Sequence, residues 1–267
     1  NVGIELAKGK YIKVVDGDDT VDSEEFAKLI DVLEYEDSDV VLNNYYEDFA
    51  KDNVLNLQKI YGHLKEGIQY HFDDLCYEDY GFTSWGPILS CSSYRSDVLK
   101  KGNFKLSEKM FYVDMELNIN VAILCDTVTY YDFNIYRYLL GREGQSVSRD
   151  SYKRNYKHHE NVSINMIDTY YRHVDHLSEQ KKRYIEEHLI RPMLSTQYEI
   201  CINYFRKAGP FKEYNTRLKK YPYFYNNPKI QIKSVKFHRL TSGSLIFLNS
   251  FLIFCNRFTA KFRSIFH

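Results

Sequence analysis

Glycine, proline and tryptophan are scarce in this sequence, and its five cysteines are scattered along it. The cysteines are odd in number and no two of them stand in a Cys-x-x-Cys spacing, which argues against a disulfide framework and against a zinc site. A reducing compartment therefore fits best. The first residues are not a basic segment followed by an apolar one, so no secretory leader is expected. We expect a cytoplasmic protein.

Acidic residues are missing from the last part of the chain. The net charge is zero overall, but residues 1–213 carry a balance of −10, and the residues after Glu213 carry +10. Such an asymmetry indicates a polyanionic partner. No nucleic-acid-binding motif accompanies the charge, so nucleic acid is not expected.

The sequence also lacks a long uninterrupted apolar run. Residues 244–263 form an apolar helix candidate, but Asn249 and Ser250 interrupt it, and no run reaches the ~18 residues of a membrane-spanning helix. An apolar helix with basic flanks fits a position in the membrane interface. The alternative is a C-terminal helix that covers the domain core. We favour a membrane surface as the partner of the basic C-terminal tail, which places the protein peripherally at the inner face of the cell membrane.

With 44% hydrophobic and 27% charged residues, the 267-residue chain is globular. Its pattern changes near residue 150, and we expect domains at residues 1–150 and 151–267. Strands are expected at 10–15, 39–46, 54–61, 127–133 and 134–140, and helices from Asp22 onward, near 94–100 and over 113–124. Residues 151–208 predict two long helices that are split near residue 177. The histidines on their polar stretches, which we interpret as solvated, are His158, His159, His173 and His176.

The most informative segment is Asp16-Gly17-Asp18-Asp19, which follows an apolar run. Like charges this close repel one another, so the cluster is costly unless a cation or ligand offsets it. An EF-hand loop is excluded because Val21 and Ala27 stand where it needs glycine and glutamate. An ordinary Asp-rich turn is the alternative. We favour a metal-diphosphate site, since ligands of open α/β sheets gather past the carboxyl ends of strands.

A second candidate is Asp114, in the first turn of the predicted helix 113–124. Spacing from Leu117 places it on the same face as the apolar residues, whereas Glu116 falls on roughly the opposite side. The positive end of the helix dipole favours an ionised Asp114 there. A carboxylate of this kind is a candidate general base. The equally weighted alternative is a helix cap that satisfies backbone N–H groups.

Two further segments are less specific on their own. Arg142 lies between glycines in a loop after Tyr136-Arg137 and could reach an anionic ligand, although a surface arginine is the simpler reading. Trp85-Gly86 lies in a segment of small residues, where the ring could stack on a sugar or belong to the core.

Together these segments resemble, in order, the bacterial family 2 glycosyltransferases of the GT-A fold. The matching stretches are Asn1-x-Gly3-x-x-x-Ala7-x-Gly9-x-Tyr11-Ile12, Asp16-Gly17-Asp18-Asp19, Trp85-Gly86, Tyr112-Val113-Asp114-Met115-Glu116, Tyr136-Arg137 and Arg142-Glu143-Gly144-Gln145-Ser146. The sequence differs from the family at Val113, where the family has an acid. The family's first strands, which hold the nucleotide base, have no counterpart, so the chain is expected to lack them and to bind donor poorly by itself.

The resemblance implies roles for these residues. Asp16 and Asp18 would serve the nucleotide sugar and ligate Mg²⁺ or Mn²⁺, and Asp19 would help to orient it. Asp114 would be the general base. The remaining implied roles are diphosphate binding by Arg142 and acceptor binding by Trp85 and Gly86.

We therefore expect an α/β fold, a partial GT-A (Rossmann-like) sheet with flanking helices, followed by a helical extension. The expected activity is inverting transfer of a sugar from a nucleotide diphosphate-sugar to a glycan or lipid-linked acceptor in surface polysaccharide synthesis. The alternative is a non-catalytic, membrane-associated binding protein that carries a decayed transferase domain.

Overall fold

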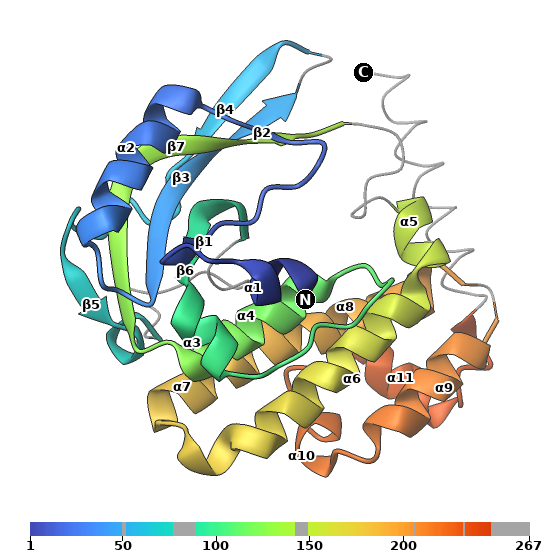
Figure 1. The fold of residues 1–267 in the computed structure, drawn as a ribbon. Helices are drawn as coiled ribbons and strands as arrows, with labels where there is room; N and C mark the ends of the chain where they lie inside the picture. Colours follow the sequence, from blue (N-terminus) through green and yellow to red (C-terminus); the bar gives the residue numbers. More distant parts are fainter. Residues whose placement is uncertain (50–51, 77–88, 142–148, 206, 232, 247–267) are drawn as a thin grey trace. The chain divides into compact units, whose positions relative to one another are not determined.

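The computed structural model describes residues 1–49, 52–76, 89–141, 149–205, 207–231 and 233–246 (Figure 1). The chain divides into two compact units. Unit 1 consists of Asn1–Gln145 and Asn165–Leu189, and unit 2 consists of Ser146–Ile164 and Ile190–His267.

A mixed sheet forms the centre of unit 1 (Figure 1). Its strands are β1 (Tyr11–Ile12), β2 (Thr20–Val21), β3 (Val40–Phe49), β4 (Val54–Gln58), β5 (Gln69–His71), β6 (Ser92–Arg95) and β7 (Thr127–Leu139). The order is β1-β6-β3-β7-β2, with β4 paired to β3 and β5 paired to β7. Strands β3 and β7 are parallel and the other pairs are antiparallel. The expected α/β class is confirmed.

Strand β3 is the central strand of the sheet. Its first five residues, from Val40 to Asn44, are all buried. A continuous buried run, rather than an alternating one, is typical of a strand that is covered on both faces. The sequence-based strand at 39–46 is therefore confirmed, although β3 continues to Phe49.

The separate strands predicted at 127–133 and 134–140 are wrong. The structure has one strand, β7, of 13 residues. Its register with β3 shifts beside Asn44, so that Leu42 pairs with Tyr130 and Asn44 with Asn134. A bulge of this kind absorbs extra residues and bends a strand without ending it, which explains why the sequence pattern breaks where the strand does not.

Helix α2 (Ser23–Tyr35) packs on β7 and begins where the sequence predicts. Asp22 is its N-cap, and its carboxylate accepts hydrogen bonds from the Glu24 and Glu25 N–H groups. Together with Val41 and Ile135 of the sheet, Leu29 forms the centre of an apolar cluster. Ile30, the next residue of the helix, is 54% exposed.

The other helical elements that belong wholly to unit 1 are short, apart from α4. They are α1 (Val2–Leu6), α3 (Ser96–Lys101), α4 (Val113–Leu124), α7 (Glu179–Tyr184) and the 3₁₀ turns η1 (Phe72–Cys76), η2 (Leu89–Cys91) and η3 (Val174–His176). Helix α6 (Tyr156–His173) and the π-helical segment η4 (Ile185–Ile190) cross the boundary between the units. The predicted helix 113–124 and the break near residue 177 are confirmed.

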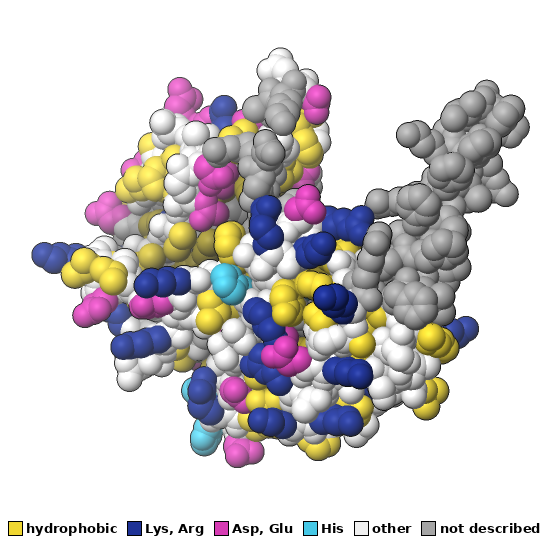
Figure 2. Space-filling model, turned by 90° about the vertical axis from the view of Figure 1, so that its right-hand side faces the viewer, with side chains coloured by type: hydrophobic (Ala, Val, Ile, Leu, Met, Phe, Trp, Pro, Cys, Tyr) yellow, Lys and Arg dark blue, Asp and Glu magenta, His cyan; other side chains and the backbone are white. Residues whose placement is uncertain are grey.

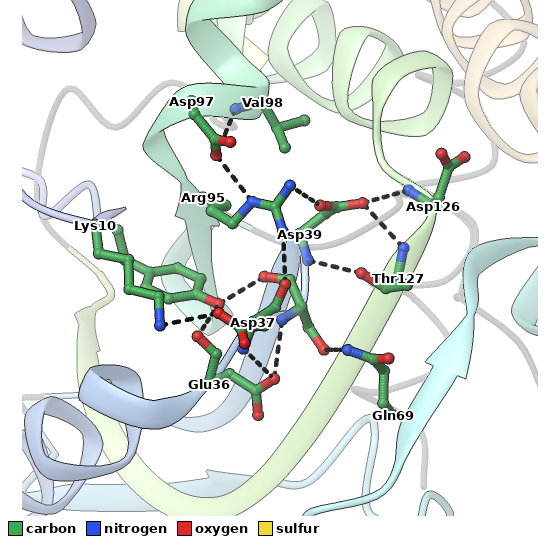
Figure 3. Close-up of polar contacts among 12 residues, drawn as sticks. Lys10, Glu36, Asp37, Asp39, Gln69, Arg95, Asp97, Val98, Asp126 and Thr127 are labelled. Carbon is green, nitrogen blue, oxygen red and sulfur yellow. Dashed lines mark hydrogen bonds and ion pairs between the residues drawn. The ribbon is translucent and has the colours of Figure 1, made fainter.

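A cluster of polar side chains fastens the sheet edge at which β3 and β7 both begin (Figure 3). Asp39 Oδ2 accepts hydrogen bonds from the Asp126 and Thr127 N–H groups, at 2.7 and 3.1 Å. Asp39 Oδ1 lies 3.2 Å from the Arg95 guanidinium. One buried carboxylate thus joins the starts of both parallel strands and the end of β6.

The other carboxylates of this edge are also held by donors. Arg95 Nε donates to Asp97 Oδ1 at 2.8 Å. Glu36 accepts from two backbone N–H groups that follow it and, at 3.0 Å, from the Tyr131 hydroxyl. We call Asp39, Arg95, Asp97 and Glu36 the Asp39 cluster. Burial opposes ionisation of Glu36, but hydrogen bonds from Ser38 and Tyr131 outweigh it and lower its pKa.

Unit 2 is helical. Besides its part of α6 it contains α5 (Arg149–Arg154), α8 (Arg191–Asn203), α9 (Gly209–Leu218), α10 (Pro222–Tyr225) and α11 (Lys233–Leu240). Tyr198 of α8 packs against Phe211 and Tyr214 of α9, with ring centroids 5.7 and 4.7 Å apart. In the part of the chain that the structure describes, no helix combines the length and the apolar character needed to cross a bilayer.

The expectation that the helical histidines are solvated is wrong for His159. Its ring is 2% exposed and its Nδ1 lies 2.9 Å from Gln197 Oε1 of α8. Burial lowers its pKa to about 4, so the ring is neutral at physiological pH. The polar residues next to His159 in the sequence suggested an exposed stretch. One of them, Glu160, is itself buried and is paired with Arg217.

Candidate active site

An acidic turn follows β1 in unit 1 and consists of residues 16–19. Asp16, Gly17 and Asp18 are exposed, and Asp19 is half-buried. The Asp19 N–H donates to the Asp16 carbonyl at 3.1 Å, which closes the turn. The predicted strand continues to Val15, and this is wrong, since β1 ends at Ile12 and Val15 is 42% exposed.

Strand β7 holds the acidic turn through Tyr136. The Tyr136 hydroxyl donates to Asp19 Oδ2 at 2.7 Å and accepts from the Asp16 N–H at 3.1 Å. The other Asp19 oxygen accepts from the Leu139 N–H at 2.9 Å. The Tyr136 ring is almost fully buried, so this hydroxyl is a fixed point. Both Asp19 oxygens are therefore used to position the turn.

The next strand residue fixes the far side of the turn. Arg137 donates to Asp22 Oδ2 at 2.9 Å, while the other Asp22 oxygen caps helix α2. The Glu25 N–H hydrogen bond and then the Arg137 contact lower the pKa of Asp22. Tyr136 and Arg137, which the sequence singles out together with the loop that follows, thus hold the two ends of the segment 16–22.

Asp16 is in a different electrostatic environment from Asp22. Partial burial, followed by the negative charges of Asp19 and Asp18, raises the pKa of Asp16. The carboxylate is exposed and faces like charges, which is the arrangement that a bound cation would stabilise.

Asp114 lies in the first turn of α4, two residues after a strained residue. Tyr112, the N-cap, has φ 69° in the left-handed region, where a non-glycine residue costs about 1–3 kcal/mol. Desolvation by surrounding protein raises the pKa of Asp114. Hydrogen bonds from its own N–H and from that of Met115 oppose the rise, and the charge of Asp16 adds to it. The acidic turn and Asp114, almost a hundred residues apart in sequence, therefore lie within electrostatic reach of each other.

The predicted inward orientation of Asp114 is wrong. Asp114 is exposed to solvent, whereas Met115 to Ala122 are all buried. Helix α4 is covered on all sides after its first turn, so apolar spacing does not indicate which face is inward. Glu116 is buried too, and it accepts hydrogen bonds from Ser107 and Asn165. The N-cap of α4 is Tyr112, so Asp114 is not the helix cap of the alternative interpretation, although hydrogen bonds from backbone N–H groups of the first turn act to lower its pKa.

Tyr138 was missed by the sequence reasoning. Burial, followed by the charges of Asp19, Asp16, Asp18 and Asp114 in that order, raises its pKa. The charges of all four carboxylates therefore act on the pKa of this one phenol. Tyr136 and Tyr138 are two residues apart on a strand and share a face, so once Tyr136 is on the site, the period of the strand could have pointed to Tyr138.

The N-terminal part of the chain matches a known family. Residues 1–102 match the sequence model described as Glycosyl transferase family 2. This part of the chain is therefore similar to the family 2 glycosyltransferases. A curated relative, Glycosyltransferase GlyG of Streptococcus pneumoniae serotype 4, is 46% identical over 46 residues, which are 17% of this chain and 15% of that protein.

Solved structures extend the family 2 likeness at the level of the fold. Crystal structures of S. aureus TarS 1-349 match 86% of this chain with a TM-score of 0.50 and 13% identity and, in complex with UDP-GlcNAc, 88% with 0.50 and 14%. The chain spans 60% and 62% of those chains. The GT-A-like fold with a helical extension, expected from the sequence, is confirmed.

Lys13 is a further residue of the family 2 domain that the sequence reasoning missed. Its ammonium donates to Asn43 Oδ1 at 2.9 Å and to the carbonyls of Ser90 and Ser92 at 3.1 and 3.3 Å. Burial lowers its pKa to about 8. It ties the segment leading into the acidic turn to β3 and β6. An isolated lysine near a strand gives no sequence signal for this role.

Three predicted site residues, Trp85, Gly86 and Arg142, lie outside the described residues. Among the residues that are described, no group of three or more His, Cys, Asp or Glu side chains is arranged to hold a metal ion. Magnesium is commonly bound through one or two carboxylates together with substrate phosphates. The donors at Asp16 and Asp18 fit that kind of site, in which a bound diphosphate supplies the missing oxygens.

Proposed function

We propose that this chain carries the catalytic centre of an inverting glycosyltransferase. It moves a sugar from a nucleotide diphosphate-sugar to a glycan or lipid-linked acceptor in surface polysaccharide synthesis. The single observation that carries the proposal is the acidic turn after β1, which Tyr136 and Leu139 hold in place while Asp16 and Asp18 remain exposed. The match of residues 1–102 to the family 2 model and the GT-A-like fold support it.

The two carboxylate positions suit two different tasks. In the acidic turn, Asp16 and Asp18 bind the diphosphate side of the donor, with Asp19 keeping the turn in place. These oxygens suit Mg²⁺ or Mn²⁺, which supplies charge neutralisation for the leaving diphosphate when bound. Arg142 adds a further cation for that group, and Trp85 and Gly86 contact the acceptor.

Asp114 acts as the general base. It takes the proton of the acceptor hydroxyl, whose oxygen bonds to the anomeric carbon. The bond from that carbon to the diphosphate oxygen breaks, and the electron pair leaves with the nucleoside diphosphate. A single displacement of this kind inverts the anomeric centre. The raised pKa of Asp114 makes it a stronger base than an ordinary aspartate.

The donor class has independent support. One of the matching TarS structures is a complex with UDP-GlcNAc, and we extend to this chain only the class, a nucleotide-activated sugar. For the acceptor side, the excess of positive charge after Glu213 favours a peripheral position at an anionic membrane, where lipid-linked acceptors reside.

The proposal is tested by calorimetric titration of the full chain with a panel of nucleoside diphosphates, with and without Mn²⁺. We expect Mn²⁺-dependent binding that falls at least tenfold in Asp18→Asn, because the turn loses a carboxylate. Asp31→Asn is the matched control, since Asp31 is exposed on α2 away from the turn, and it should bind like the parent chain.

Two outcomes contradict the proposal. Binding that ignores Mn²⁺ and is equal in Asp18→Asn would remove the donor role of the acidic turn. No binding at all by a chain that is folded, as judged by a cooperative thermal transition, would favour the non-catalytic binding protein with a decayed transferase domain.

A further inference from the structure

The exposed face of helix α11 carries an unusual combination of side chains. Lys233, Lys236, Phe237 and Leu240 follow an i, i+3, i+4, i+7 spacing and therefore lie in one sector of the helix, about 100° wide. Phe237 is 47% exposed and Leu240 is 86% exposed. Both lysines are exposed as well. We call these four residues the α11 face.

The orientation of α11 is fixed by its opposite side. Val235 and His238 are each 1% exposed and pack into unit 2. Arg239 donates through NH2 to the Tyr198 hydroxyl at 2.7 Å and through Nε to Asn215 Oδ1 at 3.0 Å. Its guanidinium lies 3.7 Å from the ring centroid of Tyr225. The α11 face is therefore presented to solvent by a well-packed helix.

The surroundings of the α11 face are basic and also carry an exposed ring. Tyr223 of α10 is 55% exposed, and Arg239 links α11 to α10 through the Tyr225 carbonyl at 2.9 Å. Lys219, Lys220 and Lys229 flank α10 and are exposed. The sequence has no acidic residue after Glu213, so α10 and α11 themselves carry no negative side chain. Figure 2 shows Lys and Arg side chains interspersed with hydrophobic ones on the side that it draws.

We propose that the α11 face binds an anionic lipid bilayer, with the lysines at the headgroups and Phe237 and Leu240 in the acyl boundary. Basic and large apolar side chains on one helical face are the pattern of an interfacial helix. A nucleic acid would be bound through the lysines, and that binding would not require an exposed leucine. A second copy of this chain would place positive charge against positive charge, so it is disfavoured as the partner. The inference rests on the proposed membrane-facing position of this enzyme and assigns it to residues 233–240.

The test is co-sedimentation of the full chain with vesicles of phosphatidylglycerol and phosphatidylcholine, and with vesicles of phosphatidylcholine alone. We expect binding only to the anionic vesicles, weakening as salt is raised. Lys233→Gln with Lys236→Gln should weaken the partition about tenfold or more, since each lysine near an anionic surface contributes about 1 kcal/mol. Phe237→Ser with Leu240→Ser should weaken it at least fivefold.

Matched controls use exposed residues of unit 1. Lys101→Gln with Lys105→Gln removes the same charge, and Val2→Ser with Leu6→Ser removes similar exposed apolar surface. Both should bind vesicles like the parent chain. Phe237→Trp provides a second measurement: its emission should shift to the blue with anionic vesicles and be quenched by brominated lipid, beyond any change of the parent protein.

Several results would overturn the proposal. If the parent chain and both α11 variants bound vesicles equally, the α11 face would not be the membrane contact. Loss on removing the lysines but not the apolar pair, together with binding to single-stranded DNA, would indicate a general polyanion surface. Nucleoside diphosphate titration of the same variants separates the proposals: unchanged nucleotide binding with unchanged vesicle binding rejects only the α11 face.

Discussion

Unit 1 contains two groups of carboxylates that the fold treats in opposite ways. In the Asp39 cluster, donors and the Arg95 cation surround the acids, and the pKa of Glu36 falls despite burial. In the acidic site, burial first and the charges of other carboxylates second raise the pKa values of Asp16 and Asp114. The first group stabilises the fold. The second costs stability, which is typical of a site that is completed by a ligand.

The two groups also lie at different places along the same strand. The Asp39 cluster joins the beginnings of β3 and β7, whereas Tyr136, Tyr138 and Leu139 reach the acidic turn near the end of β7. Strand β7 therefore contacts the Asp39 cluster at its beginning and the acidic turn near its end. Substitutions that exchange the character of the two groups measure this difference.

The largest expected effect is on catalysis, from Asp114→Asn. Removing a general base lowers turnover about 10²- to 10⁴-fold, while donor binding stays within about twofold. The base must be ionised, so activity rises with pH through its pKa, and the raised pKa moves this limb above that of an ordinary aspartate. Initial rates across pH check both points. Unchanged turnover in Asp114→Asn, or the same rise of activity with pH in that variant, would show that Asp114 is not the general base.

The next effect is on stability, from Asp39→Ala. Breaking a buried ion pair by removing one partner costs about 3–5 kcal/mol, and here two backbone N–H groups lose their acceptor as well. Denaturant unfolding measures the loss. Asp37→Ala is the control, since the Asp37 side chain is 81% exposed and its pair with Lys10 should contribute under about 1 kcal/mol. Equal losses would mean that the Asp39 cluster is not the fastening point.

A matched pair of tyrosines compares the two groups directly. Tyr136→Phe removes the hydroxyl on Asp19, and Tyr131→Phe, on the same strand, removes the hydroxyl on Glu36. A hydrogen bond to a charged group contributes about 1.5–3 kcal/mol, so both variants should lose some stability. Only Tyr136→Phe should weaken Mn²⁺-dependent nucleotide binding, by about tenfold. The same weakening in both variants would indicate a general loss of fold.

A smaller effect of opposite sign is expected for Asp16→Asn. The pKa of Asp16 is raised in the folded chain, so its contribution to stability is present below the unfolded pKa of about 3.9 and is lost as pH rises through the folded value. The variant should thus be more stable than the parent near pH 7, by up to the ~2–4 °C that 1 kcal/mol gives in a chain of this size.

This advantage should disappear near pH 3, a value below the unfolded pKa of about 3.9. Thermal melts at both pH values test it, with Asp31→Asn as a control that should show no such difference. A loss of stability in Asp16→Asn at neutral pH would mean that the turn carries no electrostatic cost.

The smallest effect is expected for Gly17→Ala. A Cβ at Gly17 meets no atom within 4 Å, and the residue does not need a left-handed backbone. Stability should change by less than about 0.5 kcal/mol. At Gly102 an added Cβ would collide with the Leu124 side chain, so Gly102→Ala should cost about 1–3 kcal/mol. A large loss at Gly17 would mean that the glycine is required by the fold rather than by a ligand.

Much of the local structure could be predicted from the sequence. The Asp22 cap and helix α4 follow from residue types and spacing, and the run at β3 follows from its apolar pattern. The long strand β7 could not, because its bulge interrupts the pattern while the hydrogen bonds to β3 continue. The burial of Glu116 and His159 could not either, since only a tertiary partner makes a buried polar side chain stable.

For the site, the sequence by itself determined which carboxylates are the candidates, because three acids in four residues after an apolar run are costly unless a cation or ligand offsets them. Only the tertiary structure decided which groups surround each carboxylate. In the folded chain the Tyr136 hydroxyl donates a hydrogen bond to Asp19, and the charge of Asp16 acts on Asp114. The charges of all four acids act on Tyr138. The physical reason is that electrostatic coupling depends on distance in space, and residues 16, 114 and 138 become neighbours only when the sheet and helix α4 are assembled.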